Sequence, residues 1–210
     1  MSPAHPLVRV ALTGGIATGK SHCLARLAEL GAPTIDADVL ARQAVAPGTA
    51  GFAAVQSRFG AAIVTAGGEL DREALGRLVF ADPEARRALE AIVHPTVYAA
   101  IGRWFETLAR SGQHPIGIAD IPLLYETGHD GDFDAVVVVS CEPQAQIERL
   151  MARSGLSWED ATRRIAAQWP VSEKARRATY VIDTSASFET TDAQVRNVWE
   201  QLQQRATGRT

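Results

Sequence analysis

The order of apolar and polar stretches at the start of the chain predicts a strand, a helix and a second strand. An apolar run at 8–12 ends at two glycines, which is typical of a buried strand. Leucines recur at helical spacing over 20–30, and Gly31 follows as a helix stop. A short apolar stretch at 33–35 predicts the second strand, so this segment indicates the beginning of a parallel α/β sheet.

Residues 38–111 show helical patterns and no convincing strand pattern. Asp71 and Asp82 are typical N-caps, and the second is followed by a proline at the first helical position. In the later part of this stretch, apolar side chains recur on one face, which predicts a long amphipathic helix. Pro95 lies inside that pattern, so we expect the helix to kink or break near His94.

Strand patterns return in the second half of the chain. Apolar runs at 116–119, 135–139 and 180–182 each have the length of a strand. A polar, arginine-rich helical stretch covers roughly 142–177, and a closing amphipathic helix covers 192–204. The predicted fold class is α/β, with a five-stranded parallel sheet and helical insertions after the second and fourth strands.

Composition and charge are those of an ordinary globular protein of 210 residues, with 46% hydrophobic and 21% charged residues. The net charge of −3 offers no general attraction to nucleic acid. The longest aliphatic run, 135–139, is too short to span a membrane, and the first residues lack a signal-peptide pattern. Cys23 and Cys141 form no disulfide framework or metal cluster, and we expect both to be small buried side chains. These features predict a cytoplasmic protein that binds neither nucleic acid nor membrane.

The segment Gly14-x-x-x-x-Gly19-Lys20-Ser21 matches the complete P-loop pattern and lies between a predicted strand and a predicted helix. Glycines let backbone N–H groups close around phosphate oxygens, and the dipole of the following helix favours the bound anion. Lys20 supplies a charge for the outer phosphates, and the Ser21 hydroxyl is placed to ligate Mg²⁺. The sequence therefore predicts a site for a nucleoside triphosphate with Mg²⁺.

Two carboxylates follow the second predicted strand. In an extended segment, Asp36 and Asp38 point to the same side because they are two residues apart. Ligands of parallel α/β folds bind at the carboxyl ends of the strands, so a carboxylate here could accept a proton from an attacking hydroxyl or hold a metal-bound water. The alternative is that Asp38 caps a helix beginning at Val39, and the two roles are compatible.

The third predicted strand is followed by Asp120, which resembles the acidic residue that holds Mg²⁺ through water in P-loop proteins. The alternative is a loop aspartate beside the turn at Pro122. The next residues, Leu123, Leu124 and Tyr125, look suited to packing rather than chemistry.

Positive charge is concentrated in residues 142–178, which carry seven positive and five negative side chains and leave the rest of the chain at −5. Arginines on a mobile helical segment could close on transferring phosphates and neutralise charge in the transition state. For most of these side chains, a solvated helix face is the simpler interpretation. Arg149 and Arg153 share one helix face, as do Arg164 and Gln168.

Six segments together resemble the dephospho-coenzyme A kinase family, from Val10 to about Ser187. They are LTGGIATGKS, IDADVLARQAVAPG, LGRLVFADPEARRALEAIVHP, DIPLLYE, RLMARSGLSWEDATRRIAAQWP and EKARRATYVIDTSAS. The P-loop is common to many proteins, whereas the Asp-Ala-Asp, His-Pro and DIPLLYE blocks in this order are specific. The resemblance implies a three-layer α/β/α fold of the P-loop NTPase type. It also implies transfer of the ATP γ-phosphoryl group, with Mg²⁺, to the ribose 3′-hydroxyl of 3′-dephospho-coenzyme A, the last step of coenzyme A biosynthesis.

The same resemblance implies roles for individual residues. The catalytic residues would be Asp38, which receives the acceptor proton, with Lys20 and Arg153. ATP would be bound by Gly15, Ile16, Ala17, Thr18, Gly19, Lys20, Ser21, His22, Arg153 and Arg164. The acceptor would be bound by Asp38, His94 and Leu123, and the metal by Ser21 and Asp120. Taken alone, His94 is more typical of a structural residue on a long helix.

The resemblance also divides the chain into regions. Residues 1–38, 112–141 and 178–210 would form the nucleotide-binding core, with 183–187 beside the adenine. Residues 39–111 would bind the acceptor, and 142–177 would form a lid.

This chain departs from the family's usual pattern at three positions. Ala17 stands where glycine is usual, His22 where threonine is usual, and Trp169 where a methionine often precedes the proline. We expect Ala17 to be tolerated only if its backbone φ angle is negative.

Two other functions remain open for a P-loop protein of this kind. One is a kinase of another small acceptor, such as a nucleoside monophosphate or shikimate. The other is a nucleotide-dependent switch or binding module. The sequence argues against a switch because it lacks the guanine-reading motifs Asn-Lys-x-Asp and Thr-Lys-x-Asp.

Overall fold

The computed structural model describes residues 7–208. Predictions that concern residues 1–6, including the signal-peptide pattern, and residues 209–210 lie outside the described part. The chain divides into two compact units. The first comprises Met1–Ile35 and Phe105–Thr210, and the second comprises Asp36–Trp104.

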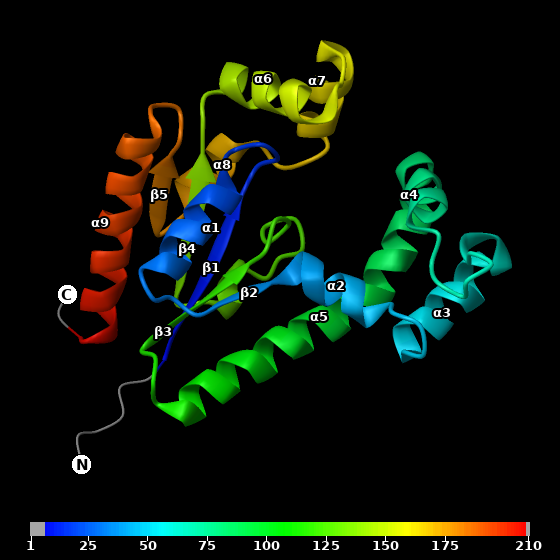
Figure 1. Ribbon diagram of the computed structural model, residues 1–210, viewed down its shortest axis with the longest axis horizontal. Helices are drawn as coiled ribbons and strands as arrows, with labels where there is room; N and C mark the ends of the chain where they lie inside the picture. Colours follow the sequence, from blue (N-terminus) through cyan, green and yellow to red (C-terminus); the bar gives the residue numbers. More distant parts are fainter. Residues whose placement is uncertain (1–6, 209–210) are drawn as a thin grey trace. The chain divides into compact units, whose positions relative to one another are not determined.

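A five-stranded parallel sheet forms the centre of the first unit (Figure 1). Its strands lie in the order β2-β3-β1-β4-β5. Their bounds are Val8–Gly14 (β1), Thr34–Asp36 (β2), Ile116–Asp120 (β3), Ala135–Ser140 (β4) and Tyr180–Asp183 (β5). The predicted α/β class is confirmed, and the observed order places β1 between β3 and β4, where the carboxyl ends of the strands form a typical ligand site.

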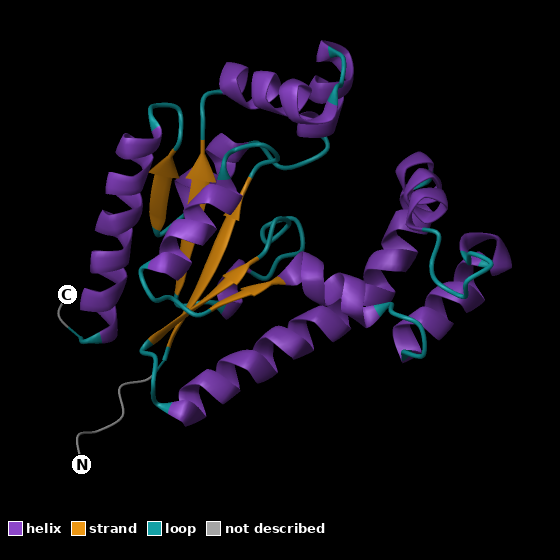
Figure 2. Cartoon of the chain, in the orientation of Figure 1, coloured by secondary structure: helices purple, strands orange, loops and turns teal. Residues whose placement is uncertain are grey.

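Helices fill most of the connections between these strands, as the periodicity predicts (Figure 2). They are α1 (Lys20–Glu29), α2 (Ala37–Ala44), α3 (Ala50–Phe59), α4 (Arg72–Ala81), α5 (Pro83–Ser111), α6 (Pro143–Ser154), α7 (Trp158–Ala166), α8 (Val171–Arg177) and α9 (Phe188–Ala206), with short 3₁₀ helices at Ala61–Ile63 (η1) and Asp130–Asp132 (η2). Residues 142–177 thus contain three helices. The closing helix starts earlier than predicted because Ser187 caps it, accepting a hydrogen bond from the Thr190 N–H at 3.3 Å.

Both faces of the sheet are covered by other parts of the chain. Val137 of β4 packs in one core with Leu27 of α1 and Val195 of α9. Successive side chains of a strand point to opposite faces, and the next residue, Val138, is also fully buried. The helix α8 contacts β4 as well. The strands β3 and β4 are therefore almost entirely apolar, because neither of their faces meets water.

The second unit is helical and has a core of its own, in which Val55 and Leu75 are buried. Residues 38–111 contain no strand, and their single isolated bridge joins Val64 and Leu70. The predicted cap at Asp71 is confirmed, since its carboxylate accepts a hydrogen bond from the Ala74 N–H at 2.8 Å.

The long helix α5 is continuous through Pro95, so a break near His94 is wrong, and the kink predicted as the other outcome stays a prediction. The N-terminal end of this helix agrees with the prediction. Asp82 lies immediately before Pro83, and its side chain accepts a hydrogen bond from the Glu84 N–H at 2.8 Å.

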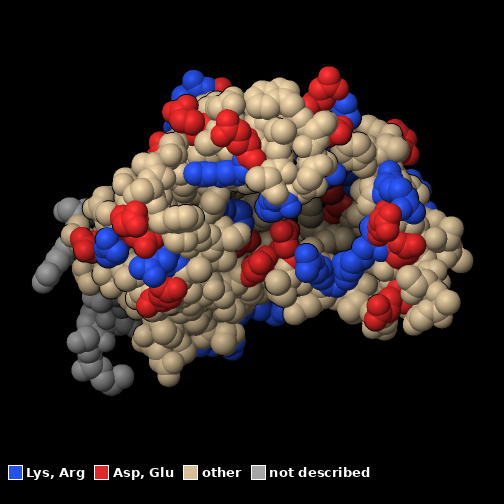
Figure 3. All heavy atoms as spheres, turned by 45° about the horizontal axis from the view of Figure 1, so that its top comes forward, with Lys and Arg blue, Asp and Glu red and all other residues tan. Residues whose placement is uncertain are grey.

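Charges of both signs are interspersed over the face of the molecule drawn in Figure 3. None of the helices in residues 7–208 combines the length and apolar character that crossing a membrane requires.

Candidate active site

The phosphate loop lies between the end of β1 and the start of α1, and close packing explains its first two glycines. A Cβ atom on Gly14 would lie 2.6 Å from the carbonyl oxygen of Val139 on β4. A Cβ atom on Gly15 would lie 2.6 Å from Nε2 of Gln146 on α6. Both distances are shorter than van der Waals contact, so a side chain at either position would force its neighbours to move. The loop is thus fitted closely against β4 and α6.

Backbone amides of the loop are mostly left without an internal partner. The N–H and the hydroxyl of Thr18 both donate to the carbonyl oxygen of Gly15, at 3.3 and 2.9 Å. Amides gathered in a loop at the start of a helix form a cradle for an anion. Five loop amides find no acceptor within residues 7–208, and they belong to Gly15, Ala17, Gly19, Lys20 and Ser21.

Ala17 has a positive φ angle of 59°, so the expectation of a negative φ at this position is wrong. Among the non-glycine residues that the structure describes, it is the only one with a positive φ. Left-handed backbone costs such a residue about 1–2 kcal/mol, because Cβ comes too close to the following carbonyl oxygen. The loop therefore holds local strain at the centre of the amide cradle, and the surrounding contacts must maintain it.

We predict that Ala17→Gly leaves the free energy of unfolding unchanged or raises it by up to about 1 kcal/mol. Relief of the left-handed strain offsets the greater freedom of glycine in the unfolded chain. Ala152 is the matched control, because it is exposed within α6 and Ala152→Gly should cost about 1 kcal/mol. Urea unfolding of both variants measures the difference, and equal destabilisation by the two changes would contradict the prediction.

Lys20 and Asp120 form an ion pair beside the cradle. The Lys20 Nζ donates to both carboxylate oxygens of Asp120. Asp120 is the last residue of β3 and lies opposite Leu12 in the pairing with β1, so the sheet brings the two side chains together. Their side chains are only 15% and 7% exposed. The alternative of a loop aspartate beside the turn is wrong, since Asp120 ends a strand of the sheet.

The two residues predicted to hold Mg²⁺ have suitable chemistry. Mg²⁺ at phosphate-transfer sites typically keeps water and takes one or two protein oxygens together with the substrate phosphates. The Ser21 hydroxyl, on the first turn of α1, and the Asp120 carboxylate are oxygen donors of this kind. Both residues stay candidates for the metal.

His22 bonds to other residues of the protein through its imidazole ring and its backbone N–H. Its Nε2 lies 2.8 Å from Oδ1 of Asp192 on α9, and its ring centroid lies 5.0 Å from that of Phe188. Its backbone N–H donates to the carbonyl oxygen of Gly19 at 3.0 Å. The imidazole therefore joins α1 to α9, while its predicted part in ATP binding stays a prediction.

Two of the seven positive side chains in the arginine-rich stretch are left available to a ligand. Arg153 on α6 and Arg164 on α7 are exposed, and neither has a hydrogen bond or ion pair with any described residue. They are the two arginines predicted to contact ATP. The others have partners in the protein, and they are Arg149, Arg163, Lys174, Arg176 and Arg177.

The Asp36–Asp38 pair, in the second unit, differs from the prediction. The strand ends at Asp36 and α2 begins at Ala37, so the two carboxylates do not share an extended segment. Asp36 is the cap of α2 and accepts hydrogen bonds from the N–H groups of Asp38, at 2.7 Å, and Val39, at 3.2 Å. The interpretation of Asp38 as the cap is therefore wrong. Asp38 lies in the first turn of α2 and is exposed.

The remaining predicted acceptor residues lie in different units. His94 is half-buried on α5 of the second unit, where its ring meets that of Tyr98 edge to face, with centroids 6.4 Å apart. Leu123 follows β3 in the first unit and is 36% exposed, whereas Leu124 and Tyr125 are buried. Packing is thus confirmed for the latter two, and Leu123 has a surface that a ligand could contact.

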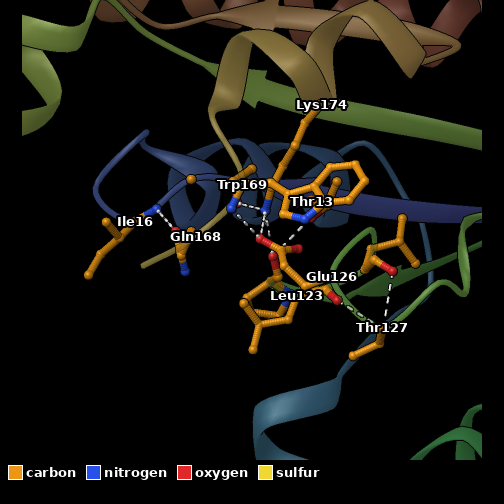
Figure 4. Close-up of polar contacts among 12 residues, drawn as sticks. Thr13, Ile16, Leu123, Glu126, Thr127, Gln168, Trp169 and Lys174 are labelled. Atoms are coloured by element: carbon orange, nitrogen blue, oxygen red, sulfur yellow. Dashed lines mark hydrogen bonds and ion pairs between the residues drawn. The ribbon is translucent and has the colours of Figure 1, made fainter. Parts of the chain in front are cut away.

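Sequence reasoning missed three side chains that contact the phosphate loop. Gln146 and Gln168 form hydrogen bonds with the backbone of Ile16, and Lys174 donates to the carbonyl oxygen of Gly14. Figure 4 labels Ile16, Gln168 and Lys174. Lys174 is fully buried, so it is not one of the side chains that form the predicted solvated face. The DIPLLYE block held a signal for it, because Glu126 of that block is its ion-pair partner.

The two cysteines are buried, as predicted. Burial raises the pKa of Cys23, which lies on α1 close to the loop, to about 12. Burial also raises the pKa of Cys141. Both thiols therefore stay protonated at neutral pH, which makes them poor nucleophiles and weak metal ligands.

Free loop amides at the carboxyl end of a parallel strand, with an adjacent lysine and aspartate, define a P-loop protein of the kinase-like α/β class. The family model described as dephospho-CoA kinase matches residues 8–190. The chain belongs to the dephospho-CoA kinase family.

Individual relatives support this membership. A dephospho-CoA kinase of Symbiobacterium thermophilum is 51% identical over 190 residues, which cover 90% of this chain and 79% of that protein. One from Anaeromyxobacter dehalogenans is 52% identical over 180 residues, covering 86% and 85%. The structure of dephospho-CoA kinase from Campylobacter jejuni superposes with a TM-score of 0.71 at 26% identity, over 96% of this chain and 98% of that one. The resemblance seen in the sequence is confirmed.

Proposed function

We infer that this protein is an ATP-dependent kinase that phosphorylates the ribose 3′-hydroxyl of 3′-dephospho-coenzyme A, giving coenzyme A and ADP, the last step of coenzyme A biosynthesis. Membership of the dephospho-CoA kinase family over residues 8–190 carries the conclusion. The cradle of unpaired amides between β1 and α1 supports it, because such a cradle suits the phosphates of ATP.

The reaction needs few groups from the protein. The bond between the γ-phosphorus and the β–γ bridging oxygen breaks, and a bond from the ribose 3′-oxygen to that phosphorus forms. The proton of the 3′-hydroxyl passes to the carboxylate of Asp38, our candidate base. Positioning and neutralisation of charge supply most of the acceleration in transfers of this kind.

Positive charge for the transferring group comes from three side chains in this proposal. Lys20, at the cradle, stabilises the charge that spreads over the equatorial oxygens, and the exposed Arg153 and Arg164 add to it. Ser21 and Asp120 would hold Mg²⁺, which neutralises charge on the β- and γ-phosphate oxygens when bound. His94 and Leu123 are the proposed acceptor contacts, and we propose a cytoplasmic location.

An acceptor panel tests this function. The purified protein is incubated with ATP labelled on the γ-phosphate and with dephospho-coenzyme A, a nucleoside monophosphate or shikimate. We expect label to appear in coenzyme A and ATP consumption to require that acceptor. Transfer to either other acceptor at a higher kcat/KM would overturn the assignment, and steady ATP hydrolysis without any acceptor would favour a switch.

A further inference from the structure

Ile16, in the middle of the phosphate loop, is held by a glutamine on each side. Its N–H donates to Oε1 of Gln168 at 2.8 Å, and its carbonyl oxygen accepts from Nε2 of Gln146 at 2.7 Å. Gln146 lies on α6 and is 4% exposed, and Gln168 lies between α7 and α8. The two ends of the α6–α7 segment thus meet at one residue of the loop.

These two hydrogen bonds fix the direction of neighbouring peptide groups. In a planar trans peptide, the carbonyl group and the following N–H point in opposite directions. Because the Ile16 carbonyl faces Gln146, the Ala17 N–H must point away from Gln146. That N–H is one of the amides without an acceptor in the described chain. Gln168 fixes the peptide between Gly15 and Ile16 in the same way. The N–H of that peptide faces Gln168, and its carbonyl group, on Gly15, faces Thr18.

Gln168 is held in place by the residues that follow it. The Trp169 N–H donates to Oε1 of Glu126 at 3.0 Å, and the same oxygen lies 2.7 Å from Nζ of Lys174 (Figure 4). The Trp169 ring stacks on that of Tyr125, with centroids 6.2 Å apart and planes 7° from parallel. The return from α7 to α8 is therefore anchored to the loop after β3, which leaves Gln168 little freedom.

Lys174 extends this anchor to the entrance of the phosphate loop. Its Nζ lies 3.5 Å from the carbonyl oxygen of Gly14 and 3.3 Å from that of Pro122. A fully buried ammonium group is retained only when its charge and its donors are paired, as Glu126 and these carbonyl groups pair them. The contacts at Gly14 and Ile16 bracket the start of the cradle.

We propose that Gln146 and Gln168 are positioning residues that maintain the strained backbone at Ala17 and aim its free amide, and so set the affinity of the loop for phosphate. The proposal rests on the proposed function, since it takes the phosphates of ATP as the ligand of the cradle. The left-handed φ of Ala17 needs such support, because an unsupported loop would relax toward a negative φ. The two hydrogen bonds also couple the position of the α6–α7 segment to the backbone conformation of the phosphate loop.

The test uses methionine, which matches glutamine in length and removes its hydrogen bonds. Calorimetric titration of the full chain with inorganic tripolyphosphate should show Gln146→Met and Gln168→Met each weakening binding about 3–10-fold, the range expected for one net hydrogen bond. Adenosine, which has no phosphate, should bind each variant as it binds the unmodified protein. Gln144→Met is the matched control, because Gln144 is exposed on the same helix and its side chain donates to Glu148, at 2.7 Å, rather than to the phosphate loop.

A second pair of variants separates the effect of the hydrogen bond from the effect of an added charge. Gln146→Glu and Gln168→Glu add the same negative charge beside Ile16, but only Gln168→Glu keeps its hydrogen bond, because Gln146 serves as a donor and Gln168 as an acceptor. We therefore expect Gln146→Glu to bind tripolyphosphate more weakly than Gln168→Glu. Gln168 is only half-buried, so the Gln168 variants keep the test open if those of Gln146 fail to fold.

The outcomes separate this proposal from the function on which it rests. Unchanged tripolyphosphate affinity in folded Gln168→Met overturns the positioning role while the unmodified protein still binds ATP and phosphorylates its acceptor. Equal loss of adenosine and tripolyphosphate affinity also overturns it, because that pattern indicates general damage to the fold. If the unmodified protein binds neither ATP nor tripolyphosphate, the proposed function fails as well.

Discussion

Replacing Lys20 with alanine should lower kcat about 10³-fold with both substrates saturating, the size of effect expected when a charge that stabilises the transferring phosphoryl group is lost. Lys20 begins α1 within the amide cradle, and the carboxylate of Asp120 accepts hydrogen bonds from its ammonium group. During phosphoryl transfer, negative charge develops on the transferring group, and Lys20 at the cradle lies close to that group in our proposal. Initial rates at increasing ATP measure the effect, and recovery of full kcat at high ATP would show that Lys20 only binds the nucleotide.

The control for this variant must remove a positive charge from the same helix. Arg26 lies on α1 six positions later, and its partners are Glu29 and Asp192, at the protein surface. Arg26→Ala should keep kcat near that of the unmodified protein. Because Lys20→Ala also removes the partner charge of a nearly buried carboxylate, its unfolding transition has to be recorded to establish that the measured protein is folded.

The sequence predicted the sheet and the phosphate loop well because both depend on local patterns. Strands at 8–12, 116–119 and 135–139 are apolar runs of the right length, and each was found with an end shifted by one or two residues. The P-loop pattern carries its own physical reason, since glycine spacing determines whether backbone amides can reach a phosphate. Strand order is a different matter, because it depends on contacts between segments far apart in the chain.

The failures at the site have the same origin. Ala17 takes a left-handed backbone that its own side chain disfavours, and the bonds that support it come from Gln146 and Gln168. Lys174 belongs to a run of charges typical of an exposed helix, yet tertiary packing buries it against Glu126. In each case the deciding partner is more than 40 positions away, so no local pattern could identify it.

One boundary error had a local cause. The helix after the second strand begins at Ala37, so Asp36 takes the capping position that the sequence offers as an alternative role for Asp38. Both residues are good caps, and a shift of one or two positions is within the accuracy of boundaries predicted from sequence. The correction matters for function, because it leaves the Asp38 carboxylate without a structural task as a cap. Because Asp36 is the cap, it also provides the control variant for the final prediction.

Asp38→Asn should lower kcat by about 10²–10⁴-fold, the range for loss of a general base, while ATP affinity changes no more than a few-fold. Asparagine keeps the size of the side chain but cannot take the proton of the acceptor hydroxyl. The change also removes a negative charge from the first turn of α2, which costs about 0.3–1 kcal/mol of stability and cannot account for such a loss of rate. Turnover is measured with both substrates saturating, and ATP affinity is measured separately by titration.

Asp36→Asn is the matched control, because it makes the same chemical change two positions earlier in the chain. Asparagine caps a helix as well as aspartate, so α2 should be preserved and kcat should stay close to that of the unmodified protein. A large loss in Asp38→Asn alone supports Asp38 as the base. Near-normal turnover in Asp38→Asn, or an equal loss in both variants, would remove Asp38 from that role, because the first result needs no carboxylate there and the second points to damage at the start of α2.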